Sequence, residues 1–108
     1  MRKLLMRHCE FSAVFASNDH MAFGAFEELR RVGLQIPQHI SLVGFDDILF
    51  ARYLTPALTT VNFPLEQMSL EAVQLVIQKL HKNKRDVNFK LAPSLVIRDS
   101  VKNLLNTL

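Results

Sequence analysis

Two short polar clusters in this sequence have the side chains needed to bind a hydroxylated ligand. The first, Ser17-Asn18-Asp19, follows one apolar run, and the second, Asp46-Asp47, follows another run that ends at Phe45. Amide and carboxylate groups exchange hydrogen bonds with hydroxyls, and an aromatic ring covers the apolar face of a sugar. The two clusters therefore fit a polyol or sugar site, provided that the fold brings them together.

The same residues also suit a structural role. Each cluster stands immediately before a helical pattern, where Asn and Asp are preferred N-cap residues. Capping and binding are compatible if Asp19 caps its helix while Asn18 faces a ligand. A paired-carboxylate acid–base site is disfavoured, because no candidate nucleophile or second carboxylate pair stands at another strand end.

The sequence contains no motif typical of a cofactor or metal site. No GxGxxG motif follows any expected strand, and the four histidines are scattered without the spacing of metal ligands. We therefore predict a protein that is not an enzyme, with no catalytic residue, metal or cofactor.

The spacing of apolar residues predicts the elements that carry the two clusters. Strands are expected at residues 12–17, 40–45, 58–63 and 95–98. A helix with Ala22, Phe26 and Leu29 on its buried face runs to Gly33, and a short helical segment covers residues 48–53. Pro64 opens a long helix with one apolar face, which the basic stretch at residues 82–86 ends. The phenylalanines expected in the core are Phe15, Phe26 and Phe63.

Alternation of strands and helices is typical of an α/β fold with a mostly parallel sheet flanked by helices. In such sheets ligands bind beyond the carboxyl ends of the strands. Because both polar clusters follow strands, this order predicts that they meet at one edge of the sheet.

Composition narrows the class further. The chain has 108 residues with a net charge of only +3, a weak field that does not by itself call for nucleic acid. The single cysteine excludes an internal disulfide and fits a reducing compartment. No apolar run approaches a membrane span, and Arg7 interrupts the first residues too early for a signal peptide. We therefore predict a cytoplasmic protein of at most one domain, with no membrane partner.

Four segments, in order and with ordinary spacing, resemble one family. They read FASNDHMAFGA at residues 15–25, GLQIPQHISLVGFDD at 33–47, PALTTV at 56–61 and LVIRDS at 95–100. This set is similar to the effector domain of the lactose-repressor/galactose-repressor (LacI/GalR) family of bacterial transcription regulators, and four linked segments are far more specific than a single motif.

The resemblance implies a three-layer, type I periplasmic-binding-protein-like subdomain. Residues 1–101 correspond to the C-terminal part of an effector-binding and dimerisation domain, and residues 102–108 to a C-terminal tail. Nothing resembles the DNA-binding headpiece, so operator DNA is expected to be a partner only through a headpiece that this chain lacks.

The resemblance also implies roles for particular residues. Asn18 and Asp46 align with positions that contact a small-molecule effector, with a sugar expected, and Phe45 flanks them. Homodimers are expected to use residues 21–29 and 50–57. The interface residues within these stretches are, in order, Met21, Ala22, Phe23, Phe26 and Leu54.

Helical geometry bears on one of these positions independently. At 3.6 residues per turn Phe23 falls about 100° from the buried stripe, between Glu27 and Arg30. A large ring there is either an isolated exposed residue or part of a partner interface.

Three functions follow. The first is the sugar-sensing and dimerising part of a LacI/GalR-type regulator, with a repressor as the expected type. The second is a periplasmic-type sugar-binding protein of the same fold, against which the Pro-x-Leu-Thr-Thr segment and the lack of a leader argue. The third is an α/β enzyme, which the scarcity of glycine at strand ends disfavours.

Overall fold

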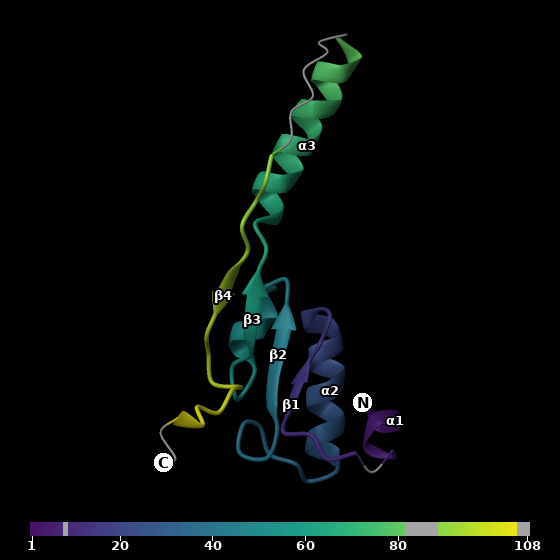
Figure 1. Cartoon of the computed structure of the whole chain (residues 1–108), viewed down its shortest axis with the longest axis vertical. Helices are drawn as coiled ribbons and strands as arrows, with labels where there is room; N and C mark the ends of the chain where they lie inside the picture. The colour runs from purple at the N-terminus through teal and green to yellow at the C-terminus, as the bar shows by residue number, and fades with distance from the viewer. Residues whose placement is uncertain (8, 82–88, 106–108) are drawn as a thin grey trace. The chain divides into compact units, whose positions relative to one another are not determined.

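The computed structural model describes residues 1–7, 9–81 and 89–105, which belong to two compact units. Unit 1 comprises Met1–Asn62 and Ser94–Leu108, and unit 2 comprises Phe63–Pro93 (Figure 1). The predicted basic stretch at residues 82–86 and the last three residues of the predicted tail lie outside the described residues.

Unit 1 is built on a four-stranded sheet with the order β1-β2-β3-β4. The strands are β1 (Ala13–Phe15), β2 (Ser41–Phe45), β3 (Thr59–Asn62) and β4 (Ser94–Val96). The first three are parallel and β4 is antiparallel to β3, which confirms the predicted mostly parallel α/β fold. The antiparallel strand arises because the chain leaves unit 1 after Asn62 and returns at Ser94, which pairs with Asn62.

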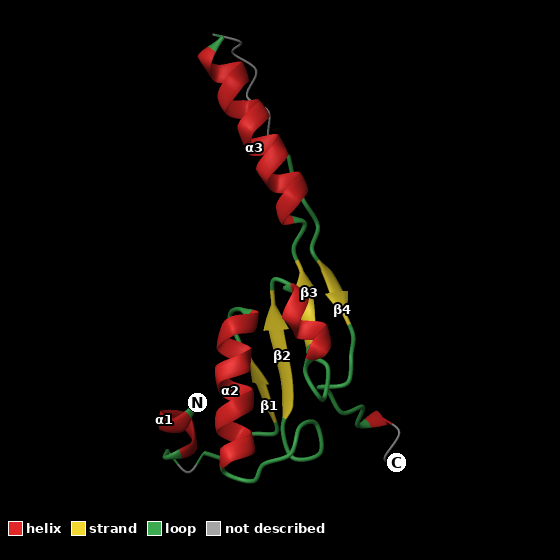
Figure 2. Ribbon diagram, turned by 180° about the vertical axis from the view of Figure 1, so that it is seen from behind, coloured by secondary structure: helices red, strands yellow, loops and turns green. Residues whose placement is uncertain are grey.

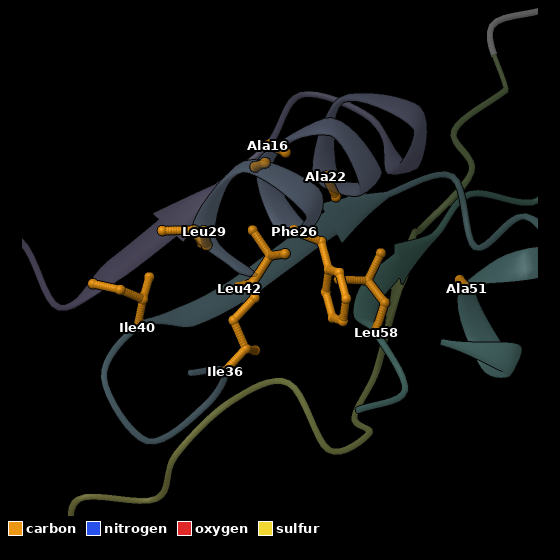
Figure 3. Packing of buried hydrophobic residues seen from close by; sticks show 10 residues of the cluster. Ala16, Ala22, Phe26, Leu29, Ile36, Ile40, Leu42, Ala51 and Leu58 are labelled. Carbon is orange, nitrogen blue, oxygen red and sulfur yellow. The ribbon is translucent and has the colours of Figure 1, made fainter. Parts of the chain in front are cut away.

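Helix α2 (Asp19–Arg31) covers one face of this sheet (Figure 2). Its Phe26 and Leu29 pack in one cluster with Leu42 of β2 and Leu58, which precedes β3 (Figure 3). The three leucines are fully buried, and each stabilises the fold by about 1.5–3 kcal/mol. The predicted short helix is the 3₁₀ helix η1 (Leu49–Tyr53), which adds the buried Ala51 to the same core.

The prediction that β1 is covered on both faces of the sheet is wrong. Phe15 is 65% exposed, although the unbroken apolar run around it predicted a strand covered on both faces. Side chains alternate along a strand, so Phe15 and its pairing partner Val43 point away from the α2 side to which Val14 and Leu42 belong. Of the predicted core phenylalanines, Phe26 is confirmed, whereas Phe63 is half-buried.

The short helix α1 (Arg2–Leu5) is attached to α2 by the ion pair between Arg2 and Glu28. Glu28 accepts hydrogen bonds from Arg31 at 2.7 Å and from Arg2 at 3.0 Å. The hydrogen bonds from these two guanidinium groups lower the pKa of Glu28 from 4.5 to about 2. A lowered pKa means that this pairing supports the fold at neutral pH and loses its effect as the pH falls from 4.5 towards 2.

Unit 2 consists mainly of helix α3 (Leu65–Leu80). The predicted helix is confirmed, but none of its residues is fully buried, because the described residues of unit 2 form no second layer of secondary structure that would cover its apolar face. Within the described part of the chain, no helix combines the length and the apolar composition needed to cross a membrane.

Candidate functional site

The first polar cluster lies at the carboxyl end of β1, and the helix cap predicted at Asp19 is formed by Asn18 instead. Asn18 is the N-cap of α2, since its Oδ1 accepts a hydrogen bond from the Met21 N–H at 2.8 Å. Asp19, predicted to be the cap, is completely buried. Because capping uses only the Asn18 oxygen, the two N–H groups of its half-buried amide remain suitable donors to a ligand.

The buried Asp19 carboxylate joins three elements at this edge of the sheet. Its Oδ1 accepts a hydrogen bond from the Thr60 hydroxyl of β3 at 2.6 Å, and its Oδ2 accepts one from the Ile48 N–H at 2.9 Å. A buried carboxylate is tolerated only when such donors replace water. Asp19 therefore fixes the loop after β2 relative to the start of α2 and to β3.

Gly44 makes room for this carboxylate. A Cβ atom at Gly44 would lie 2.1 Å from Asp19 Oδ1 and 3.0 Å from Leu58 Cδ2. Glycine is thus required in the middle of β2 because the carboxylate occupies the space of a side chain.

The second polar cluster forms a strained turn at the carboxyl end of β2. Asp46 has a φ of 108° and Asp47 a φ of 52°, in the region that favours glycine. The turn is held by the Asp46 N–H, which donates to the Val61 carbonyl of β3 at 2.9 Å. The Asp46 side chain is exposed at this edge, whereas Phe45 is half-buried. Strain of about 1–3 kcal/mol per residue persists where the surroundings over-determine the conformation, and it gathers at ligand sites.

The strain at Asp46 can be measured by two substitutions that both remove the carboxylate. We expect Asp46→Gly to be about 1 kcal/mol more stable than Asp46→Ala, because only glycine adopts a φ of 108° without steric cost. Urea unfolding of the two variants tests this, with the wild-type chain as reference. An alanine variant as stable as the glycine variant would show that the turn is relaxed.

Asp47 anchors the same turn from the other side. Its Oδ1 accepts a hydrogen bond from Arg98 Nη2 at 2.5 Å, and its Oδ2 accepts one from the Asn62 amide at 3.0 Å. Partial burial raises the pKa of the Asp47 carboxyl, but the hydrogen bonds from Arg98 and Asn62 and the charge of Arg98 outweigh burial and leave the pKa below its ordinary value. Asp47 is therefore a charged structural anchor at neutral pH.

The structure thus brings the two predicted clusters together at the carboxyl edge of β1 and β2. The Asp19 carboxylate, next to Asn18, accepts the Ile48 N–H, two residues beyond Asp46. Sequence reasoning missed Thr60, Asn62 and Arg98, which support the edge from β3 and from the chain after β4. Thr60 could have been identified from the sequence, since a hydroxyl in a strand of core residues needs a buried hydrogen-bond partner.

The predicted dimer residues divide into two groups. Ala22 and Phe26 are core residues with 0% and 6% exposure, so this part of the interface prediction is corrected. These two residues pack beneath the surface of α2 and are not exposed on it. Met21 is 58% exposed, and Phe23 and Leu54 are half-buried against the core. Phe23 also lies 6.0 Å from the ring of His20, measured between centroids.

One cavity of unit 1 lies away from the predicted site. It measures about 520 Å³ and lies near the C-terminal end of α2, lined among others by Phe26, Arg30 and Pro56. It is an open hollow, and its lining includes the polar side chains of Arg30, Gln35 and Gln38 but no residue of the two polar clusters. In the described part of the chain no three His, Cys, Asp or Glu residues are placed to hold a metal ion.

Comparison with known proteins identifies relatives over nearly the whole chain. The model of a periplasmic binding protein-like domain matches residues 2–101. The chain is 39% identical over 108 residues to the HTH-type transcriptional regulator GalR of Salmonella typhimurium, covering 99% of this chain and 32% of that protein.

Two solved structures show the same fold. The complex of the transcriptional regulator CelR with cellobiose has a TM-score of 0.86 at 34% identity, over 92% of this chain and 31% of that one. The lac repressor dimer bound to operator and the anti-inducer ONPF has a TM-score of 0.83 at 28% identity, over 92% and 35%. The chain spans about a quarter to a third of the length of the curated relatives that it matches.

Proposed function

The chain belongs to the periplasmic binding protein-like family, as a fragment of a LacI-family effector domain, and on this premise we propose that it forms one wall of a sugar site in a transcriptional regulator. Its relatives are transcriptional regulators and repressors, as the resemblance of the four sequence segments predicted, and they include a ribose operon repressor and regulators solved with cellobiose or ribose bound. The function of this chain is accordingly binding and signalling, and we propose that it is not catalytic.

The observation that carries the proposal is the strained turn at Asp46. An exposed carboxylate on a backbone with a φ of 108° stands next to a half-buried Phe45, at the edge where Asn18 presents its amide. Among the residues that the structure describes, none forms a hydrogen bond or ion pair with the Asp46 side chain, whereas four hydrogen bonds hold its turn in place. Such pre-organisation favours ligand binding, because the cost of ordering the site is already met in folding.

The mechanism follows from the incomplete site. A ligand pocket encloses most of its ligand, and the edge described here supplies only one wall. We propose that the second wall comes from another part of a longer regulator, so that a sugar binds between two subdomains. A sugar that binds one arrangement of the subdomains more tightly would shift the population towards it. Operator DNA would be contacted by a separate headpiece in the cytoplasm.

A sugar screen tests the proposal directly. Thermal shift is measured on a regulator that carries this chain, with cellobiose as the first sugar because a solved relative binds it. At least one aldose or disaccharide is expected to raise the Tm in a concentration-dependent way. No shift with any sugar, in a regulator that unfolds cooperatively, would contradict the proposal.

We further propose that this chain pairs with a second copy through the surface formed by the start of α2 and by η1. Three large apolar side chains there are strongly exposed: Met21 at 58%, Phe50 at 66% and Tyr53 at 69%. Exposed apolar residues gathered on neighbouring elements are typical of interfaces, whereas single ones are ordinary.

Met21→Lys is therefore expected to convert a dimer into a monomer in sedimentation velocity, because a buried ammonium at the interface would be unpaired. Val32→Lys, at the other end of α2 where Val32 is 44% exposed, is the matched control and should stay dimeric. A wild-type chain that sediments as a monomer at all concentrations would refute the interface.

A further inference from the structure

Arg98 is held in place by three hydrogen bonds, two of which are donated by its guanidinium group. Its Nη1 donates to the Leu58 carbonyl at 2.7 Å, and its Nη2 donates to Asp47 Oδ1 at 2.5 Å. Its backbone N–H donates to the Thr59 hydroxyl at 2.9 Å. Only 14% of the side chain is exposed, so these charge-assisted hydrogen bonds are shielded from water.

The partner of Arg98 lies in the strained turn. Asp47 follows Asp46 directly, and both residues have positive φ angles. An aspartate held in this way restrains its own backbone and that of its neighbour, because a short side chain leaves little freedom between carboxylate and Cα. The Asn62 amide holds the second oxygen, which leaves the carboxylate one orientation.

We infer that Arg98 is a positioning residue that holds Asp46 in its ligand-binding conformation by acting through Asp47. This inference rests on the proposed role of Asp46 as a sugar contact. The Asp47–Arg98–Asn62 cluster joins the turn after β2 to β3 and to the chain after β4. Asn62 pairs with Ser94, so the cluster stands where the chain leaves unit 1 and where it returns.

Because the cluster joins these elements, the pairing of β3 with β4 is coupled to sugar binding. A shift of β4 along β3 would pull Arg98 away from Asp47, release the turn and weaken sugar binding. By reciprocity, a sugar that holds Asp46 in place would hold β3 and β4 in register. The guanidinium is needed for this, because a lysine ammonium lacks the planar fork that spans the Leu58 carbonyl and the Asp47 carboxylate.

The test compares Arg98→Gln with Ser100→Ala in the 108-residue chain. Ser100 follows Arg98 by two residues and is completely buried, with its Oγ bonded to Leu42 and Thr59 and not to the turn. Both substitutions are expected to destabilise the fold, but only Arg98→Gln removes the hold on Asp47. Ser100→Ala therefore reports what a merely structural loss does to the turn.

The decisive measurement is hydrogen exchange of the Asp46 amide, which is bonded to Val61, against that of the Ala16 amide, which is bonded to Val43. In Arg98→Gln the protection of Asp46 should fall about tenfold more than that of Ala16. In Ser100→Ala the two should fall together. An equal fall of both amides in Arg98→Gln would overturn the inference.

A second variant covers the case in which Arg98→Gln does not fold. Asp47→Asn keeps the size of the side chain and leaves the Arg98 bond to the Leu58 carbonyl, and it should give the same selective loss at Asp46. Uniform exchange in this variant would equally overturn the inference.

Cellobiose affinity of a regulator carrying each variant gives an independent readout. A wild type that binds neither cellobiose nor any other sugar of the screen refutes the proposed function, while hydrogen exchange still decides the role of Arg98. If the wild type binds and Arg98→Gln binds equally well at matched folding, the positioning role is refuted and the proposed function stands.

Discussion

Gly44→Ala is expected to lower the free energy of unfolding by about 3–5 kcal/mol, a large part of the 5–15 kcal/mol typical of a domain. The added methyl group would meet the buried Asp19 carboxylate at 2.1 Å and Leu58 at 3.0 Å. To relieve the clash, Asp19 must leave its hydrogen bonds with Thr60 and Ile48, and a buried charge without partners is strongly destabilising. Urea unfolding measures the effect.

Gly24→Ala is the matched control for this substitution. Gly24 lies in the interior of α2, and a Cβ atom there would meet nothing within 4 Å. The same change of residue type should therefore stabilise the chain by about 0.5–1 kcal/mol, through helix propensity and the entropy of the unfolded chain. If Gly44→Ala were as harmless as Gly24→Ala, the buried Asp19 network would not exist as described.

Asp46→Asn is expected to weaken sugar binding by at least about 30-fold, or ~2 kcal/mol, while leaving the fold intact. A carboxylate accepts two strong hydrogen bonds from sugar hydroxyls, and an amide of the same size replaces one acceptor by a donor. Stability should change little, because the Asp46 side chain is exposed. Isothermal titration of a regulator carrying this chain, with the sugar that gives the largest thermal shift, measures the change.

Asp99→Asn provides the control for loss of charge. Asp99 is also exposed, and its backbone N–H donates to the Ala57 carbonyl, away from the Asp46 turn. The substitution removes the same charge and should leave sugar affinity within about twofold of the wild-type value. Equal losses in Asp46→Asn and Asp99→Asn would mean that net charge, and not contact with the sugar, sets the affinity.

The parts of the fold that depend on local pattern were predictable from sequence. All four strands, the helix after Asn18 and the long helix after Pro64 lie where apolar spacing and turn residues predicted them. The meeting of the two polar clusters also followed from the sequence, because parallel strands place their carboxyl ends at one edge.

The residues that were not predictable act over long sequence distances. Arg98 and Asp47 are 51 positions apart, and Thr60 and Asp19 are 41 apart, so no local spacing relates them. The capping of α2 by Asn18 instead of Asp19 has a similar origin. Either side chain suits an N-cap, and Asp19 is instead buried beside Gly44, where the absence of a Cβ atom leaves room for its carboxylate.

The exposed Phe15 shows a second reason why the sequence could not predict every feature of the fold. An apolar run without alternation indicates burial on both faces of a strand, but the pattern does not say which segment supplies the second cover. In unit 1 the face with α2 is covered, and Phe15 on the other face is not.

A crystal structure of a regulator carrying this chain with its sugar would show whether the effector binds at the carboxyl edge of β1 and β2. We expect a sugar hydroxyl within hydrogen-bond distance of the Asp46 carboxylate, a second near the Asn18 amide and the Phe45 ring against the sugar. A sugar bound instead in the cavity beside Phe26, Arg30 and Pro56, with Asp46 left in water, would contradict it.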